Sequence, residues 1–138
     1  MTVLILAACA SPEQVIARKA AFAAKQNAMF DAQRQAAELT CKDKDQCDRM
    51  FRVASDVVME MADMKVQTAT QNYVATYNPL DYGRIGMTAR RTLSSGTEEV
   101  IKLDVNCRGI GGVMPWEDCF DRVAFIYRTY KARVDRLN

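Results

Sequence analysis

The hydrophobic period changes twice along the chain, and this change constrains the fold more than any other feature. Between Lys44 and Ala62 the apolar residues recur with the 3.6-residue period of a helix. After Asp63 the period becomes two, which is typical of strands that bury one face. The helical period returns from about Trp116 to Leu137. Strands flanked by amphipathic helices predict an α+β fold.

Each of these two helices has a well-defined apolar face. The face of the helix over 44–62 consists of Cys47, Met50, Phe51, Ala54, Val57, Val58 and Met61. The face of the helix over 116–137 consists of Cys119, Phe120, Val123, Ile126, Tyr127, Tyr130, Val134 and Leu137. We expect both helices to pack on one face of the sheet, because only these stripes are large enough to bury it.

The period-two segments predict an antiparallel meander of three or four strands. The segments are 65–68, 73–77, 85–93 and 100–107, and the first two count either as two strands or as one broken strand. Ile101, Leu103 and Val105 fall on one face of the last strand. A C-terminal helix packed on one sheet face completes the expected architecture.

A longer helix is expected before these elements, from Ser11 to about Leu39. Ser11 and Gln14 form a capping box, and a proline follows the cap. The apolar stripe of this helix is poor: Val15, Phe22, Met29 and Ala36 recur every seven residues, but Lys19, Gln26 and Gln33 fall on or beside it. We therefore expect it to be the least buried helix, with exposed anchors for a partner or for self-association at Phe22, Met29 and Phe30. The alternative is an ordinary surface helix of the domain.

The chain has five cysteines, which are Cys9, Cys41, Cys47, Cys107 and Cys119. Among the last four we expect the local pairs, 41 with 47 and 107 with 119, because each brackets a predicted helix start. Each short loop would contribute roughly 2–3 kcal/mol. A zinc site is disfavoured because the spacings do not match the close pairs of structural zinc sites. An odd number of cysteines leaves Cys9 to be explained.

The sequence around Cys9 provides an explanation. An apolar run, Val3-Leu4-Ile5, precedes Leu6-Ala7-Ala8-Cys9, which resembles the lipobox of bacterial lipoproteins. The resemblance implies that Cys9 carries the lipid and that residues 1–8 are the remaining part of a signal peptide. Without an aspartate after the cysteine, it implies the outer membrane, facing the periplasm. The residues alone also allow a short buried strand over 3–6 with Cys9 in the core.

This interpretation divides the chain into three parts. Residues 1–8 are the signal-peptide remnant, residues 9–40 form the lipid anchor and the long helix, and residues 41–138 form one disulfide-stapled domain. No apolar run approaches the roughly 18 residues of a transmembrane helix. The membrane is thus expected to be reached through the lipid.

Composition excludes several kinds of function. The chain has 138 residues, a formal charge of +2 and no histidine. The charge is too small to indicate nucleic-acid binding, and the lack of histidine excludes every triad, dyad or metal site that needs one. The glycine-rich stretch 108–114 lacks the fingerprint of a phosphate-binding loop. We therefore expect neither a metal nor another cofactor.

Two surface features remain as candidate contacts. Arg108 and Trp116 flank the glycine-rich loop, which the second expected disulfide would pin, and loops on rigid scaffolds often carry binding. A basic patch would need Arg84, Arg90, Arg91 and Arg108 together, but adjacent residues of a strand face opposite sides. Glu98 and Glu99 are expected to be solvated in a hairpin turn.

The element order indicates a function class. Two helices followed by a three-stranded meander are similar to the small outer-membrane-assembly lipoproteins that support barrel insertion; the likeness is in element order only, and the final helix departs from it. We expect a membrane-anchored, non-enzymatic binding or envelope-assembly module with a protein partner. The alternative is an enzyme or enzyme inhibitor with a cleft of carboxylate, Arg and Tyr side chains.

Overall fold

The computed structural model describes residues 10–108 and 117–137. These residues form an α+β fold, as predicted, with three helices and one antiparallel sheet. The elements are α1 (Pro12–Ala36), β1 (Leu39–Cys41), α2 (Lys44–Met61), β2 (Val66–Ala69), β3 (Tyr73–Thr76), β4 (Ile85–Ser95), β5 (Glu98–Cys107) and α3 (Glu117–Asp135). The expected lipidation at Cys9, the glycine-rich loop from 109 and Trp116 lie outside the described residues.

The sheet has five strands in the order β1-β5-β4-β3-β2, so the predicted count of three or four is wrong. Strands β2 to β5 form the expected meander. The additional strand is β1, which pairs antiparallel with β5 through Leu39 opposite Ile101 and Cys41 opposite Glu99. Three residues are too few to show a period, and the partner strand lies about sixty residues away. The long helix consequently ends at Ala36 rather than at about Leu39.

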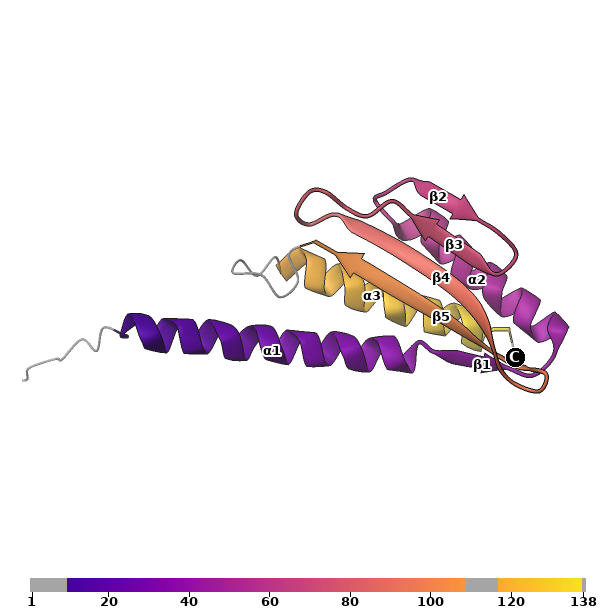
Figure 1. The fold of residues 1–138 in the computed structure, drawn as a ribbon, viewed down its shortest axis with the longest axis horizontal. Coiled ribbons are helices and arrows are strands. Elements are labelled where there is room, and N and C mark those ends of the chain that lie inside the picture. The colour runs from indigo at the N-terminus through magenta and orange to yellow at the C-terminus, as the bar shows by residue number, and fades with distance from the viewer. Residues whose placement is uncertain (1–9, 109–116, 138) are drawn as a thin grey trace, which may run out of the picture.

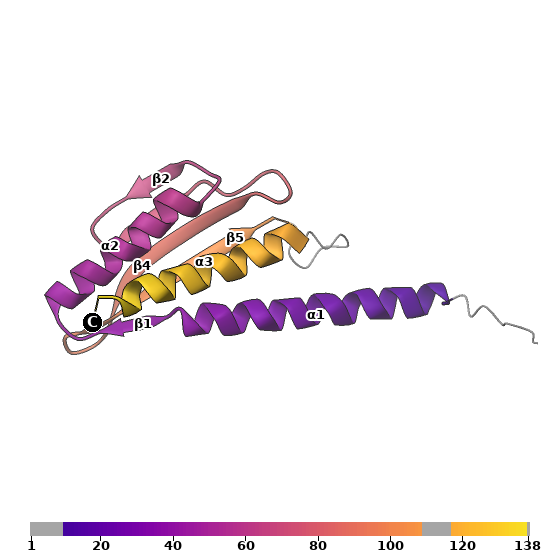
Figure 2. The ribbon, with the colours of Figure 1, turned by 180° about the vertical axis from the view of Figure 1, so that it is seen from behind.

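Helices α2 and α3 cover one face of the sheet, as expected (Figures 1 and 2). Their predicted apolar faces are buried, except that Met61, Phe120 and Leu137 are half-buried. Alternate residues of β4 and β5 provide the other side of the core. The largest side chains that are fully buried are Tyr130, Ile85, Ile101, Leu103, Ile126, Val57, Val58 and Val123.

Helix α1 runs beside this two-layer body, and its N-terminal half extends past the sheet (Figures 1 and 2). Ser11 and Gln14 form the predicted capping box. The residues that pack on the domain recur at intervals of three and four: Ala23, Gln26, Phe30, Gln33 and Ala37. Phe30 is the one buried residue of the helix, so α1 is the least buried helix, as predicted.

Both expected disulfides are formed. The Cα atoms lie 5.2 Å apart for Cys41–Cys47 and 6.4 Å apart for Cys107–Cys119, within the roughly 7 Å that a bridge can span. The first disulfide joins β1 to the first turn of α2. The second joins the end of β5 to the start of α3. Together they fix both ends of the β1–β5 edge to the helical layer.

Candidate functional site

A groove of about 350 Å³ opens between α1 and β5. Its lining comes from three elements: Asn27, Phe30, Asp31 and Arg34 of α1, Val105, Asn106 and Cys107 of β5, and Tyr127 of α3. One wall is thus a helix and the other is the edge of a sheet. Figure 1 shows that α1 and β5 diverge with distance from β1. The volume is at the lower end of the range for ligand-binding pockets.

The sheet wall of this groove is an open strand edge. On this side of β5, β1 pairs only with residues from Glu99 to Ile101. Beyond Ile101, none of the strands in the described part of the chain pairs with this edge. The backbone N–H of Val105 instead donates a hydrogen bond of 3.1 Å to the hydroxyl of Tyr127. A side chain from α3 therefore takes the place that a neighbouring strand would occupy.

The chemistry of Tyr127 favours recognition over acid–base catalysis. Burial raises the pKa of its hydroxyl, and the Val105 N–H and the nearby Arg34 only partly oppose this effect. The hydroxyl therefore stays protonated at neutral pH. Asp31 forms an ion pair with Arg34 at 3.6 Å, and both side chains are about half exposed or more. The groove thus presents neutral hydrogen-bonding groups and a balanced charge pair.

Ion pairs hold the C-terminal half of α1 against β5. Asp104 forms ion pairs with Arg34 of α1 at 3.6 Å and with Arg90 of β4 at 3.5 Å. Lys102 contacts Glu38, which follows α1, at 3.0 Å. Surface pairs of this kind stabilise the fold little, but they fix the direction in which α1 leaves the sheet. That direction determines how wide the groove opens.

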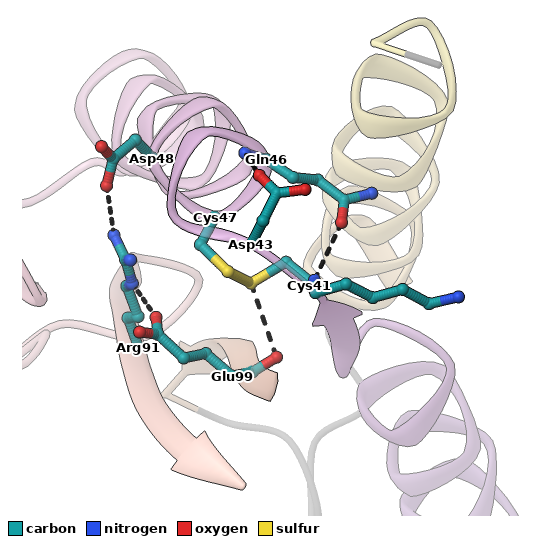
Figure 3. Close-up of a disulfide and its surroundings, with 8 residues drawn as sticks. Cys41, Asp43, Gln46, Cys47, Asp48, Arg91 and Glu99 are labelled. Carbon is teal, nitrogen blue, oxygen red and sulfur yellow. Dashed lines mark hydrogen bonds and ion pairs between the residues drawn. A yellow bond between two sulfur atoms is a disulfide. The ribbon is translucent and has the colours of Figure 1, made fainter. Parts of the chain in front are cut away.

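Arg91 lies on the opposite face of the sheet from Arg90, as the strand period predicts. Its side chain is 11% exposed and donates to Glu99 and, at 2.6 Å, to Asp48 beside the Cys41–Cys47 disulfide (Figure 3). The expectation that Glu99 is solvated is therefore wrong, because the hairpin turns before it and places it within β5. These ion pairs hold α2 to the sheet.

Two local hydrogen bonds order the start of α2 in the same region. Asp43 caps the helix by accepting the Gln46 N–H at 2.8 Å. The Gln46 side chain accepts from the Lys42 N–H at 2.9 Å (Figure 3). This contact orders the turn between the two cysteines.

A second groove, of about 620 Å³, lies between α2 and the turn that joins β2 to β3. Its charged lining includes Lys44, Asp48 and Arg91. These three groups are already paired with one another, since Asp48 forms ion pairs with both Lys44 and Arg91 at 2.6 Å. Arg52 and Asp56 complete the charged lining. Charged groups that are paired within the protein are poor anchors for a charged ligand, so this groove is the weaker candidate.

The structure separates the residues that the sequence proposed for partner binding. Phe22 and Met29 are 50% and 42% exposed, as expected, but Phe30 is 6% exposed, so its expected exposure is wrong. Phe30 faces the groove and the domain. Phe22 and Asp31 are nine residues apart, and at 100° per residue they lie on opposite sides of α1. The exposed line of Phe22 and Met29 is therefore separate from the groove.

Arg108 is held elsewhere on the surface. Its guanidinium donates to the backbone carbonyl of Leu80 and lies over the ring of Tyr82, with 5.2 Å between the guanidinium carbon and the ring centroid. It thus contacts the loop before β4 and not the α1–β5 groove. Its expected companion Trp116 lies outside the described residues.

No family model, curated protein or solved structure matches this chain. The candidate site is therefore defined by geometry alone. Among the described elements, no helix combines the length and the apolar character that crossing a membrane requires.

Sequence reasoning did not identify most of the groove. Asn27, Asp31 and Arg34 look like ordinary surface positions, and Tyr127 looks like a core aromatic. One signal was present in the sequence. The strand expected over 100–107 has eight residues, and no neighbouring strand is predicted on the side that faces away from the strand over 85–93. A long strand with only one predicted neighbour indicates an open or unexpectedly covered edge.

Proposed function

We propose that this chain is a lipid-anchored binding module of the bacterial cell envelope. In this proposal Cys9 carries the lipid in the outer membrane, and the domain faces the periplasm and binds a protein partner without chemistry of its own. The lipobox-like Leu6-Ala7-Ala8-Cys9 provides the anchor. The observation that carries the binding role is the open edge of β5 inside the α1–β5 groove.

The arrangement of α1 supports this proposal. The helix begins at Pro12, three residues after Cys9, and its residues from 12 to 22 are exposed. A helix that starts beside the lipid and packs on the domain only from Ala23 onward would hold the groove at a distance from the membrane. Eleven helical residues correspond to about 16 Å, so the groove would stay accessible to periplasmic proteins.

The disulfides also support an envelope location. Both bridges are buried and belong to the body of the fold. Disulfides of this kind persist in oxidising compartments such as the periplasm and are rare in the cytosol. Pairing four of the five cysteines also leaves Cys9 as the single thiol for lipid attachment.

The anchor is tested by intact-mass measurement and fractionation of the protein expressed in a Gram-negative host. We expect the wild-type chain to begin at a lipid-modified Cys9 and to fractionate with the outer membrane. Cys9→Ser should abolish the modification and the membrane association. Ala10→Asp should keep the lipid but move the protein to the inner membrane, by the sorting pattern of similar lipoproteins. An unmodified wild-type chain that begins at Met1 would contradict the anchor.

The binding role is tested in the same cells by a photo-crosslinking residue placed at single positions of α1. Asn27 lines the groove, whereas Ala32 is exposed and lies about 140° around the helix from it. We expect a discrete protein adduct from position 27 and none from position 32. Equal adducts from both positions would show that the groove is not the binding surface.

A further inference from the structure

We propose that the α1–β5 groove binds an extended segment of the partner polypeptide, which adds to the sheet as a strand beside Val105 and Cys107. This inference rests on the proposed binding function and names the form in which the partner is recognised. Recognition of this kind, by addition of a strand to an exposed sheet edge, takes its affinity from main-chain hydrogen bonds. Side-chain contacts along the groove then determine which sequences bind.

The backbone of β5 presents the required groups to the groove. In an antiparallel strand the N–H and C=O of one residue point to the same side, and the next residue points to the other. Arg108 exchanges hydrogen bonds with the β4 side, since its N–H donates to Arg84 and its C=O accepts from Gly83. Val105 points the opposite way, toward Tyr127. By this alternation Cys107 also points its N–H and C=O toward the groove.

The proposed segment would continue pairing that already exists on this edge. Strand β1 occupies the first part of the edge, opposite Glu99 to Ile101. The chain before β1 turns away into α1, so no strand of the described residues continues the line of β1 where the groove opens. An extended peptide opposite Val105 to Cys107 would lie on that line. The ladder of β5 would then be completed by a second chain.

The walls of the groove suit alternate side chains of such a segment. Phe30 and Val105 give an apolar surface, while Asn27 and the Asp31–Arg34 pair give polar contacts along α1. A strand presents successive side chains to opposite faces. One set would therefore face the apolar floor, and the other would face solvent and the polar rim.

The Tyr127 hydroxyl acts as a replaceable cap on the edge. In the free protein it accepts the Val105 N–H, which would otherwise be a buried donor without a partner. A bound peptide would offer a carbonyl to the same N–H. Binding thus exchanges one neutral hydrogen bond for another, and the hydroxyl competes with the ligand. This competition predicts that removing the hydroxyl strengthens binding.

The experiment uses the full chain carrying Cys9→Ser and a random library of ten-residue peptides. We expect selection to recover peptides with alternating apolar or β-branched residues. Asp31→Trp, at a groove position whose side chain is 62% exposed, should weaken their binding at least about tenfold by filling the groove, as a loss of several contacts implies. Ala32→Trp, away from the groove on the same helix, should leave the affinity unchanged.

Two further measurements address the mode of binding. Hydrogen exchange at the Cys107 amide should slow when the selected peptide is bound. Tyr127→Phe should tighten binding about fivefold, the size expected for one neutral hydrogen bond. Failure to recover peptides, equal binding by Asp31→Trp, or unchanged exchange at Cys107 would overturn the proposal. Unchanged affinity of Tyr127→Phe would overturn the role of Tyr127 as a competing cap.

These results are independent of the membrane anchor. Because the chain tested carries Cys9→Ser, peptide binding does not depend on lipidation. A lipidated protein that binds no peptide would retain the anchor and lose this inference. A protein that binds peptides but carries no lipid would retain this inference and lose the anchor.

Discussion

Phe30 of α1 packs edge-on against Phe120 of α3, with 4.8 Å between the ring centroids and an angle of 66° between the rings. This is the favoured geometry for an aromatic pair. Because Phe30 is the one buried residue of α1, the contact is the main apolar attachment of the helix to the domain. It also forms part of the groove, so the attachment of α1 and the shape of the groove depend on one side chain.

Phe30→Ala should therefore destabilise the protein, whereas Phe22→Ala should not. We expect Phe30→Ala to lower the free energy of unfolding by about 3 kcal/mol, at the lower end of the range for buried phenylalanines. Phe22→Ala removes a half-exposed ring and should change it by less than about 0.5 kcal/mol. Urea unfolding followed by circular dichroism measures both. A similar loss in the two variants would show that α1 packs through Phe22 as well.

Tyr130→Phe should stabilise the protein. Tyr130 is fully buried, its hydroxyl has no hydrogen-bond partner among the described residues, and burial raises its pKa strongly. Phenylalanine keeps the ring and removes a desolvated polar group, which we expect to raise the free energy of unfolding by about 1 kcal/mol. Tyr127→Phe is the matched control, because its hydroxyl does accept a hydrogen bond, and it should destabilise by a similar amount. Stabilisation by both substitutions would contradict this reasoning.

Asp63 should make the stability depend on pH in the acid range. Its carboxylate accepts the Ile85 N–H at 2.8 Å and pairs with Arg122 of α3 at 2.9 Å. Burial tends to raise the pKa of Asp63, but these two interactions outweigh it and leave the pKa below its usual value.

A pKa that is lower in the folded state stabilises the protein above the unfolded-state pKa of about 3.9, and this stability is lost as the pH falls through the folded-state value. We expect Asp63→Asn to be less stable than the wild type at pH 7, and the difference to shrink steadily below about pH 4. Thermal unfolding from pH 7 to pH 2 measures this. The exposed Asp81→Asn should follow the wild-type curve, and a difference for Asp63→Asn that is constant with pH would refute the assignment.

The Cys41–Cys47 disulfide should contribute measurable stability despite its short loop. For a sequence separation of 6, the loss of loop entropy in the unfolded chain is about 2 kcal/mol. We expect the double variant Cys41→Ala with Cys47→Ala to lose about this much in denaturant unfolding. Reduction of the wild-type protein should cost more than this, because it also opens the Cys107–Cys119 bridge. An unchanged midpoint would contradict a contribution of this bridge to stability.

The local structure follows closely from the sequence. The period of 3.6 over 44–62 and 117–135, the period of two over 85–107 and the Ser11 capping box each depend on residues a few positions apart. The disulfide pairing was likewise predictable, because residues close in sequence at a helix start stay close in space. These features need no knowledge of the rest of the fold.

The tertiary structure decided what lies next to the last strand. Leu39 to Cys41 carry no period of their own and become a strand only because Glu99 to Ile101 offer unpaired backbone groups to them. The sequence also did not determine which face of α1 packs on the domain, because Ala and Gln give every face a similar polarity. In the structure the face that carries Phe30 is buried, through its contact with Phe120. The groove exists because α1 leaves the edge of β5 after β1. Such long-range pairing depends on which backbone groups remain free after the local elements have formed, and no local pattern of side chains records that.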